Sequence, residues 1–304
     1  MSEKRIDEPT GTSTVGHEWD GIEELDTPLP RWWLLTFYAC IVFSIGYVVV
    51  YPAIPMVHGA TAGLWGWTSR GTLTTEMRAE QAKHATIKAA LLATPLDAID
   101  GDAHLRHEAI EGGKAAFRIH CTTCHGAGAA GGKGYPNLND DDWLWGGDVD
   151  AIHATIAHGV RQSADTASRM SQMPAFGSTG ILKPAEVQDV VSYVRSISKQ
   201  DAPDAASARG ATLFTANCAV CHGPDGKGNR TLGAPNLSDS IWLYGGDRAS
   251  LTETVTNAHY GQMPNWGAQL DPVTVKMLAV YVHSLGGGEK AAAPAPAPVA
   301  PAAK

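Results

Sequence analysis

The stretch at residues 121–125 reads CTTCH, and the stretch at residues 218–222 reads CAVCH. The two motifs begin 97 positions apart (218 minus 121) and use four of the five cysteines in a chain of 304 residues. In each motif a histidine directly follows the second cysteine. Cysteines confined to two short motifs differ from the scattered pairs of a secreted disulfide framework. The chain therefore concentrates its thiol chemistry at two similar sites.

The CxxCH pattern is the attachment signature of c-type haem. The two thiols form thioethers with the porphyrin vinyl groups, and the imidazole of the next residue reaches the iron. We therefore expect one haem to be attached through Cys121 and Cys124 and another through Cys218 and Cys221. A zinc site would need four ligands held close together. A redox-active CxxC would lie between a strand and a helix, a context that the sequence does not show.

Composition limits the classes of protein and partner. The chain has 31 acidic and 23 basic residues, which gives a formal net charge of -8. This charge argues against a nucleic-acid partner and favours a basic one. The length suits two ordinary domains with tails, and a hydrophobic content of 44% is normal for folded proteins.

One segment is long and apolar enough to cross a membrane. Residues 32–51 read WWLLTFYACIVFSIGYVVVY, without a charge or a proline. As a helix this segment would span roughly 30 Å, the thickness of a bilayer core. Tryptophan and tyrosine at its ends are typical of the headgroup level. We predict a transmembrane helix here rather than a buried globular helix, because no other segment could cover it on all sides, and Cys40 within it serves as a small apolar residue.

The flanking segments suggest how this helix is oriented. The polar residues 1–31 lack the apolar region of a cleaved signal peptide and are predicted to be a cytoplasmic segment. Arg31 at the start of the apolar segment agrees with a cytoplasmic N-terminus. Cytochromes of the c type are in general matured on the outer face of the cytoplasmic membrane. We therefore expect a single-pass protein of the bacterial inner membrane, with its haem domains in the periplasm.

Two further segments are predicted to lie outside the haem domains. Residues 52–103 form a periplasmic linker, in which the part at 74–93 has apolar residues at helical spacing. That helix either docks on a partner or spaces the domains. The Ala/Pro tail at residues 289–304 is of low complexity and is predicted to be disordered.

The region between linker and tail is an internal repeat. Copy one contains GKAAFRIHCTTCHG, YPNLNDDDWLWGGD and QMPAF, and copy two contains GATLFTANCAVCHG, APNLSDSIWLYGGD and QMPNW. The distance from the first Gly of the GG pair to the Met is 27 residues in copy one (173 minus 146) and 18 in copy two (263 minus 245). Copy one therefore carries nine extra residues, around 161–171. We predict two domains, at 104–200 and 204–288.

Each copy is predicted to begin and end with a helix. In copy one, the last helix carries an apolar stripe at i, i+3, i+4 and i+7, formed by Val187, Val190, Val191 and Val194. Helical domains of about 90 residues cannot build a large core from side chains alone. A buried haem would supply the missing apolar volume.

These motifs resemble class I cytochrome c domains. The resemblance implies an all-α fold, with one N-terminal transmembrane helix followed by two tandem cytochrome c domains. It also implies an axial methionine for each iron and a proline carbonyl that orients each histidine. Carried onto this chain in sequence order, the likeness gives His125 and Met173 for the iron of haem 1, His222 and Met263 for the iron of haem 2, and Pro136 and Pro235 as the supporting prolines.

Other side chains in the same loops remain possible ligands. Met170 precedes Met173 by three residues, and His158 and His259 lie in the corresponding loops. We favour Met173 and Met263 because only these two candidates share the QMP context. The aromatic residues of WLWGG and WLYGG either donate to haem propionates or, as we prefer, pack the haem edge.

The complete layout resembles the membrane-anchored diheme subunit, called CcoP or subunit III, of cbb3-type cytochrome c oxidases. The stretch EWDGIEELDTPLPRWWLLTFYACIVFSIGYVVVYPAIP carries the specific part of this likeness, together with GWTSRG. The resemblance implies a protein without a catalytic centre that takes electrons from soluble periplasmic cytochrome c. It implies as partners a monohaem cytochrome c subunit and the haem–copper subunit that reduces oxygen.

Two other classes are compatible with the same motifs. A membrane-tethered shuttle, or the cytochrome subunit of a periplasmic dehydrogenase, would also need two haems and an anchor. A diheme peroxidase would need one iron with an open sixth position, whereas both copies here offer QMP. Copurification of b-type haem would separate the oxidase subunit from the others.

Overall fold

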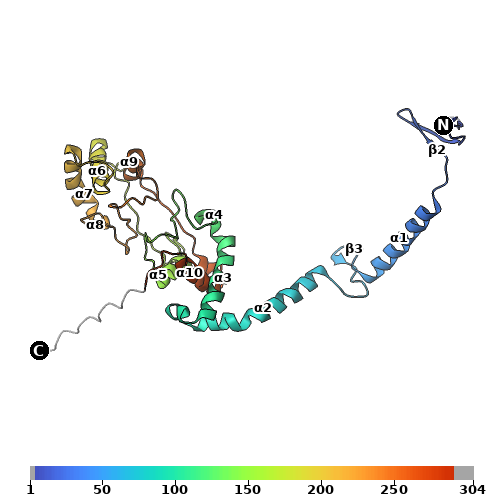
Figure 1. Cartoon of the computed structure of the whole chain (residues 1–304), viewed down its shortest axis with the longest axis horizontal. Coiled ribbons are helices and arrows are strands. Elements are labelled where there is room, and N and C mark those ends of the chain that lie inside the picture. Colours follow the sequence, from blue (N-terminus) through green and yellow to red (C-terminus); the bar gives the residue numbers. More distant parts are fainter. Residues whose placement is uncertain (1–3, 291–304) are drawn as a thin grey trace. The chain divides into compact units, whose positions relative to one another are not determined.

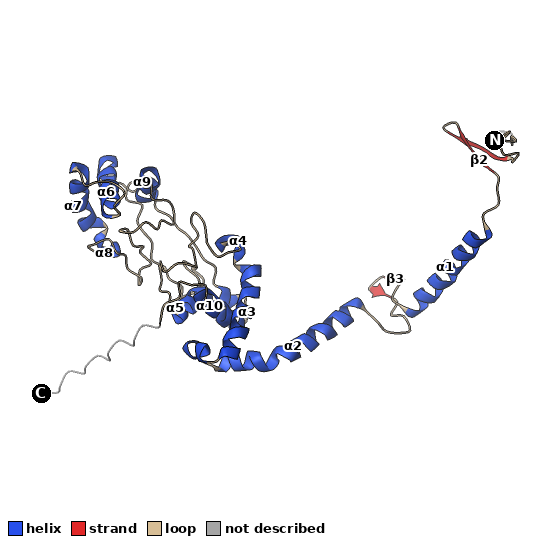
Figure 2. Ribbon diagram, in the orientation of Figure 1, coloured by secondary structure: helices blue, strands red, loops and turns tan. Residues whose placement is uncertain are grey.

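The computed structural model describes residues 4–290, so most of the tail predicted at 289–304 lies outside the described residues. The chain divides into a unit that ends at Lys83 and a unit that begins at His84. We describe each unit by itself. Helices dominate both, and the strands belong to the first unit (Figure 2).

The first unit opens with a β-hairpin. Strand β1 (Thr14–Trp19) pairs antiparallel with β2 (Ile22–Leu25). The two residues between the strands, Asp20 and Gly21, have φ angles of 49° and 86°, and an Asp-Gly pair at positive φ favours the tight turn of a hairpin. The sequence analysis predicted no strand here, because only a short part of residues 1–31 alternates between polar and apolar side chains.

The predicted transmembrane segment is helical in the structure. Helix α1 (Arg31–Val50) is shifted by one residue from the expected 32–51 and has no buried residue. Within the described part of the chain, it is the one helix long and apolar enough to cross a membrane. An apolar helix exposed on every side is unstable in water, so this exposure agrees with a lipid environment.

The segment after α1 folds back onto the end of that helix. The amide nitrogen of Leu64 donates to the carbonyl of Val49 at 3.1 Å. The ring of Tyr51 meets those of Trp65 and Trp67 edge-on, at 5.1 and 5.6 Å between centroids. In the sequence between Tyr51 and Leu64 lie the short strands β3 (Pro55–Met56) and β4 (Gly59–Ala60). An aromatic cluster therefore lies at the C-terminal end of α1.

Helix α2 (Ser69–Ala93) contains the helix expected near 74–93. The 3-10 helix η1 (Leu96–Gly101) follows it, and Leu91 and Ile99 are fully buried in the second unit. The ammonium group of Lys276 donates to the carbonyl of Leu91 at 2.9 Å. The C-terminal end of α2 therefore packs within the second unit.

The second unit contains two similar sets of helices. The first repeat forms α3 (Ala103–His120), α4 (Thr122–His125), α5 (Val149–His158) and α6 (Pro184–Ile197). The second repeat forms α7 (Ala205–Asn217), α8 (Ala219–His222), α9 (Arg248–Asn257), the 3-10 helix η2 (Trp266–Ala268) and α10 (Pro272–His283). Helices α4 and α8 have four residues each and α5 and α9 have ten each, whereas α3 has 18 residues and α7 has 13.

The packing of these helices crosses between the repeats. Helix α3 packs on α10, and α6 packs on α7 and α9. Figure 1 shows α6, α7 and α9 together, apart from α3, α5 and α10. Each packed group therefore combines the first part of one repeat with the last helix of the other, whereas the sequence predicted contiguous domains at 104–200 and 204–288. A connection of seven residues, 198–204, keeps α6 next to α7, which accounts for the exchange.

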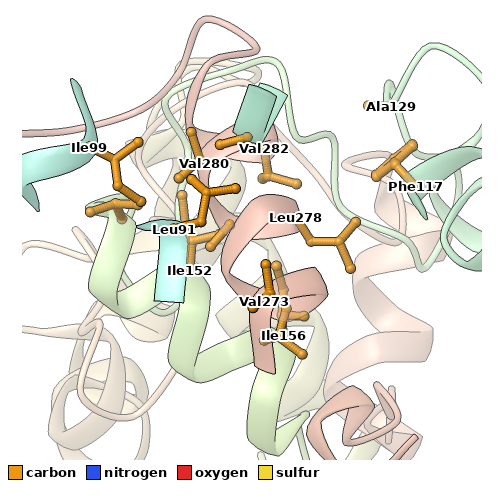
Figure 3. Close-up of a cluster of buried hydrophobic side chains, with 14 residues drawn as sticks. Leu91, Ile99, Phe117, Ala129, Ile152, Ile156, Val273, Leu278, Val280 and Val282 are labelled. Carbon is orange, nitrogen blue, oxygen red and sulfur yellow. The ribbon is translucent and has the colours of Figure 1, made fainter. Parts of the chain in front are cut away.

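Each group has its own apolar core. In the group around α10, Ile152 and Ile156 of α5 pack with Val273 and Leu278 (Figure 3). Phe117 of α3 is fully buried in the same cluster. In the other group, the valine stripe predicted on α6 is buried with a phenylalanine, a leucine and a valine of the second repeat: Phe214, Leu251 and Val255.

Candidate haem sites

The two CxxCH motifs adopt the same local structure. Cys121 caps the C-terminus of α3 and begins the single turn of α4, and Cys218 does the same between α7 and α8. Cysteines at i and i+3 of a helical turn lie on one face, and the histidine at i+4 lies beside them. The backbone therefore presents two thiols and an imidazole toward one side.

A proline carbonyl fixes the orientation of each histidine. The Nδ1 atom of His125 lies 3.1 Å from the carbonyl oxygen of Pro136, and Nδ1 of His222 lies 3.0 Å from that of Pro235. A carbonyl oxygen can only accept a hydrogen bond, so Nδ1 carries the proton and donates it. The lone pair of Nε2 is then available to a metal.

Burial keeps both imidazoles neutral. Desolvation lowers the pKa of His125 and that of His222, and the hydrogen bond to the proline carbonyl opposes this shift in part. A neutral imidazole is the form that binds a metal ion. At neutral pH each of the two histidines therefore offers an unprotonated Nε2 atom that can bind iron.

The geometry argues against zinc and against a redox disulfide. The two motifs lie in different apolar clusters, and residues 4–290 contain no group of three or more His, Cys, Asp or Glu arranged to hold a metal ion. No two cysteines within residues 4–290 form a disulfide. Burial raises the pKa of Cys121 and of Cys218 to about 11, unlike the low pKa of a reactive CxxC thiol. The donor set instead fits thioether attachment of a c-type haem beside a neutral imidazole.

Each QMP methionine packs against the same apolar cluster as a cysteine of the other repeat's CxxCH motif. Met263 and Cys121 both pack against the cluster that contains Phe117. Met173 packs against the cluster that contains Phe214 and Cys218. The sequence analysis had paired His125 with Met173 and His222 with Met263, following the order along the chain. The structure instead groups each methionine with the motif of the other repeat, because each last helix packs on the other repeat.

The crossed arrangement is supported by backbone contacts between the repeats. The amide of Val160 donates to the carbonyl of Met263 at 3.0 Å, and the amide of Met263 donates to the carbonyl of Val160 at 3.1 Å. In the other group, the amide of Ser178, five residues after Met173, donates to the carbonyl of Thr256 in α9 at 2.9 Å. Each methionine loop therefore runs beside the end of a helix from the other repeat.

The rival ligands have other neighbours. The Nδ1 atom of His158 lies 3.0 Å from a carboxylate oxygen of Asp165. His259 stacks on Tyr244 at 3.8 Å between ring centroids, and its Nε2 atom lies 3.1 Å from a threonine hydroxyl. Met170 is 50% exposed. These contacts favour Met173 and Met263 as the axial ligands.

Two residue types that recur at equivalent positions of the two repeats have packing roles. The indole N–H of Trp143 donates to the buried carbonyl of Gly287 at 2.6 Å, and Trp242 packs in the equivalent place of the other cluster.

The sequence analysis missed the glycines at the two helix crossings, Gly113 and Gly210. Each lies eight residues before the first cysteine of its motif (121 minus 113, 218 minus 210), so superposing the two copies would have found them.

Three family models together match most of the chain. Residues 11–58 match the N-terminal domain of the FixP subunit of cbb3 cytochrome oxidase. Residues 110–198 match cytochrome c, and residues 205–282 match subunit III of cbb3-type cytochrome c oxidase. The fold and these matches define a membrane-anchored electron-transfer cytochrome with two covalently bound c-type haems.

Curated relatives identify the family. The cbb3-type cytochrome c oxidase subunit CcoP of Cereibacter sphaeroides is 54% identical over 281 residues, which cover 92% of this chain and 97% of the relative. The FixP subunit of Azorhizobium caulinodans is 51% identical over 285 residues, covering 93% and 96%. The FixPc subunit of Rhizobium leguminosarum is 48% identical over 288 residues, covering 95% and 100%. The chain belongs to the CcoP/FixP family of cbb3-type cytochrome c oxidase subunits.

Proposed function

We propose that this chain is the electron-entry subunit of its oxidase complex. It takes electrons from a soluble periplasmic cytochrome c and passes them to a monohaem cytochrome c subunit and from there to the haem–copper subunit. The observation that carries this proposal is the joining of two haem sites in one packed unit of a membrane-anchored chain. The haems supply one-electron redox chemistry when bound. The chain holds and orients them.

We further propose a crossed axial ligation. His125 and Met263 would ligate the iron attached at Cys121 and Cys124, and His222 and Met173 would ligate the iron of the other site. The shared clusters of Met263 with Cys121 and of Met173 with Cys218 support this pairing. A thioether opposite an imidazole favours ferrous iron and raises the reduction potential.

The membrane orientation is also a proposal. Helix α1 would span the bacterial inner membrane with the hairpin of β1 and β2 in the cytoplasm and the haem domains in the periplasm. The cluster of Tyr51, Trp65 and Trp67 supports a membrane boundary at the C-terminal end of α1, because aromatic rings favour the headgroup level.

The experiment that tests the function is purification of the tagged chain from its own membranes in mild detergent. We expect b-type haem to copurify and cytochrome c to drive cyanide-sensitive oxygen uptake. A variant with Cys121→Ala and Cys124→Ala keeps the anchor but loses one attachment site. If it still assembles with the b-type haem, its oxygen uptake with cytochrome c should be greatly reduced. Copurification of c-type haem alone, without oxygen uptake, would contradict the proposal and indicate a tethered shuttle or a dehydrogenase subunit.

A further inference from the structure

One arginine lies where the two repeats cross. Arg161 directly follows Val160, which exchanges two backbone hydrogen bonds with Met263. Its own amide donates to the carbonyl of Arg169 at 2.8 Å, and its φ angle of 56° is uncommon for a residue other than glycine. On the C-terminal side, the amide of Gln162 donates to the hydroxyl of Ser168 at 3.0 Å, so the backbone of Arg161 is hydrogen-bonded on both sides.

The guanidinium group of Arg161 donates to both methionine loops. Its Nε atom donates to the carbonyl of Ser171 at 2.8 Å, and Nη1 donates to the carbonyl of Gly261 at 2.7 Å. Each carbonyl belongs to the residue two positions before a QMP methionine, Met173 or Met263. The same side chain therefore binds equivalent carbonyls of the two repeats.

Further contacts fix Arg161 in this place. The side-chain amide of Gln262 donates to its carbonyl at 3.3 Å, and its guanidinium lies over the ring of Tyr260, 5.7 Å from the centroid. Counted from the aspartates that cap α5 and α9, Asp148 and Asp247, Arg161 corresponds to Tyr260 (161 minus 148 equals 260 minus 247). The second repeat has no arginine at that position, so a single arginine donates hydrogen bonds to the methionine loops of both repeats.

We propose that Arg161 is a positioning residue that holds the loops of Met173 and Met263 together and so couples the two iron sites. This inference rests on the proposed ligation by those two methionines. Hydrogen bonds from a charged donor are stronger than neutral ones. The rigid fork of a guanidinium also fixes the spacing of the two carbonyls that it binds, which a flexible lysine cannot reproduce.

The test measures how fast added imidazole displaces methionine from each ferric iron, seen as the loss of the methionine-to-iron absorption band. Arg161→Leu keeps the bulk of the aliphatic stem and removes every donor. We expect it to accelerate displacement at both irons by about tenfold, the effect of losing one charge-assisted hydrogen bond at each loop. Arg161→Lys should give a smaller acceleration at both irons.

A matched control is Arg209→Leu, which removes an exposed arginine whose side chain bonds to Asp189 and the carbonyl of Ala205 and to neither methionine loop. It should leave both displacement rates unchanged. If the Arg161 variants accelerate displacement at one iron alone, or at neither, the proposal that Arg161 holds both methionine loops is wrong. Failure of Met173→Ala or Met263→Ala to remove an absorption band would instead overturn the ligation itself.

A second measurement avoids substitution of Arg161. Loss of one methionine loop from its iron removes one constraint on the guanidinium. We therefore expect imidazole to displace Met263 faster in Met173→Ala than in the unsubstituted protein. An unchanged rate would contradict the coupling, even if the Arg161 variants did not accumulate with haem.

Discussion

At the scale of single residues, the hydrogen bond between histidine and proline decides which ring nitrogen can bind iron. The carbonyls of Pro136 and Pro235 accept from Nδ1 at 3.1 and 3.0 Å. This leaves Nε2 unprotonated and fixes the plane of the ring. An outer hydrogen bond of this kind also raises the basicity of the ligand. Because a proline has no N–H, the backbone at this position acts only as an acceptor.

Trp143 provides a test of how the core beside one site is held. Its indole N–H donates to the buried carbonyl of Gly287, which lies just after α10. Trp143→Phe would keep an aromatic ring but leave that carbonyl without its donor. We expect the free energy of unfolding to fall by about 1–3 kcal/mol, measured by urea denaturation of the haem-loaded chain.

The control for Trp143 is Trp242→Phe. Trp242 occupies the equivalent place in the second repeat, and its indole nitrogen makes no hydrogen bond within residues 4–290. This variant should lose less stability than Trp143→Phe. Equal losses would mean that ring volume rather than the hydrogen bond stabilises the site.

The sequence singles out candidate haem ligands but does not determine how they pair. The thiols and histidines follow from CxxCH, and the QMP context singled out Met173 and Met263. The pairing did not follow, because the two QMP stretches are locally alike and either methionine suits either site. The packing of α6 and α10 on helices of the other repeat determines which methionine lies near which site.

At the scale of elements, the two helix crossings depend on glycine. A Cβ atom at Gly113 of α3 would meet the carbonyl oxygen of Met277 and the Cβ of Tyr281 in α10. A Cβ atom at Gly210 of α7 would meet the carbonyl oxygen of Asp189 in α6. These are backbone contacts that cannot move aside as a flexible side chain would.

We therefore expect Gly113→Ala and Gly210→Ala to lower the free energy of unfolding by about 1–3 kcal/mol or more each. Thermal unfolding followed by haem absorption would measure this loss. Gly101→Ala is the control, because nothing lies within 4 Å of a Cβ atom there. A control variant as unstable as the other two would contradict the close approach of the helices.

An ion-pair cluster joins α6 to α9. Asp201 accepts from Arg195 at 2.6 and 2.8 Å and from Arg248 at 2.9 Å. The hydrogen bond from Arg195 is the main cause that lowers the pKa of Asp201 in the folded protein. The resulting stability is present above the ordinary pKa of an aspartate and is lost as pH falls through the lowered value.

Asp201→Asn should therefore flatten the pH dependence of the melting temperature in the acidic range. The variant should melt below the unsubstituted protein at neutral pH, and the two should approach each other as the pH falls. Melting curves of both proteins between neutral and strongly acidic pH would test this. Parallel curves across that range would show that Asp201 contributes nothing to the acid sensitivity.

Helices were predicted more reliably than strands or contacts between helices. The valine stripe of α6 is buried as its spacing indicated. The hairpin of β1 and β2 was missed because its two strands have six and four residues, too few for a strong alternating pattern. The exchange of α6 and α10 was missed because periodicity identifies an apolar face without naming its partner.

At the scale of the whole molecule, net charge governs how a soluble donor approaches. The part of the chain that we propose to lie in the periplasm, residues 52–304, has 23 acidic and 20 basic residues, which gives a formal net charge of -3. A basic cytochrome c would be attracted, and the attraction extends about 10 Å at 0.1 M salt. We expect kcat/KM for oxidation of a basic cytochrome c to fall as ionic strength rises. An acidic cytochrome c as donor should show the opposite trend or none. The same salt dependence for both donors would argue against charge-guided encounter.

The most direct test of the account is a density map of the haem-loaded oxidase complex, at a resolution that shows side chains. We predict that the iron beside Cys121 and Cys124 is bound by His125 and Met263, and that the iron beside Cys218 and Cys221 is bound by His222 and Met173. A map in which each iron takes its methionine from its own repeat would contradict the crossed arrangement of the two domains.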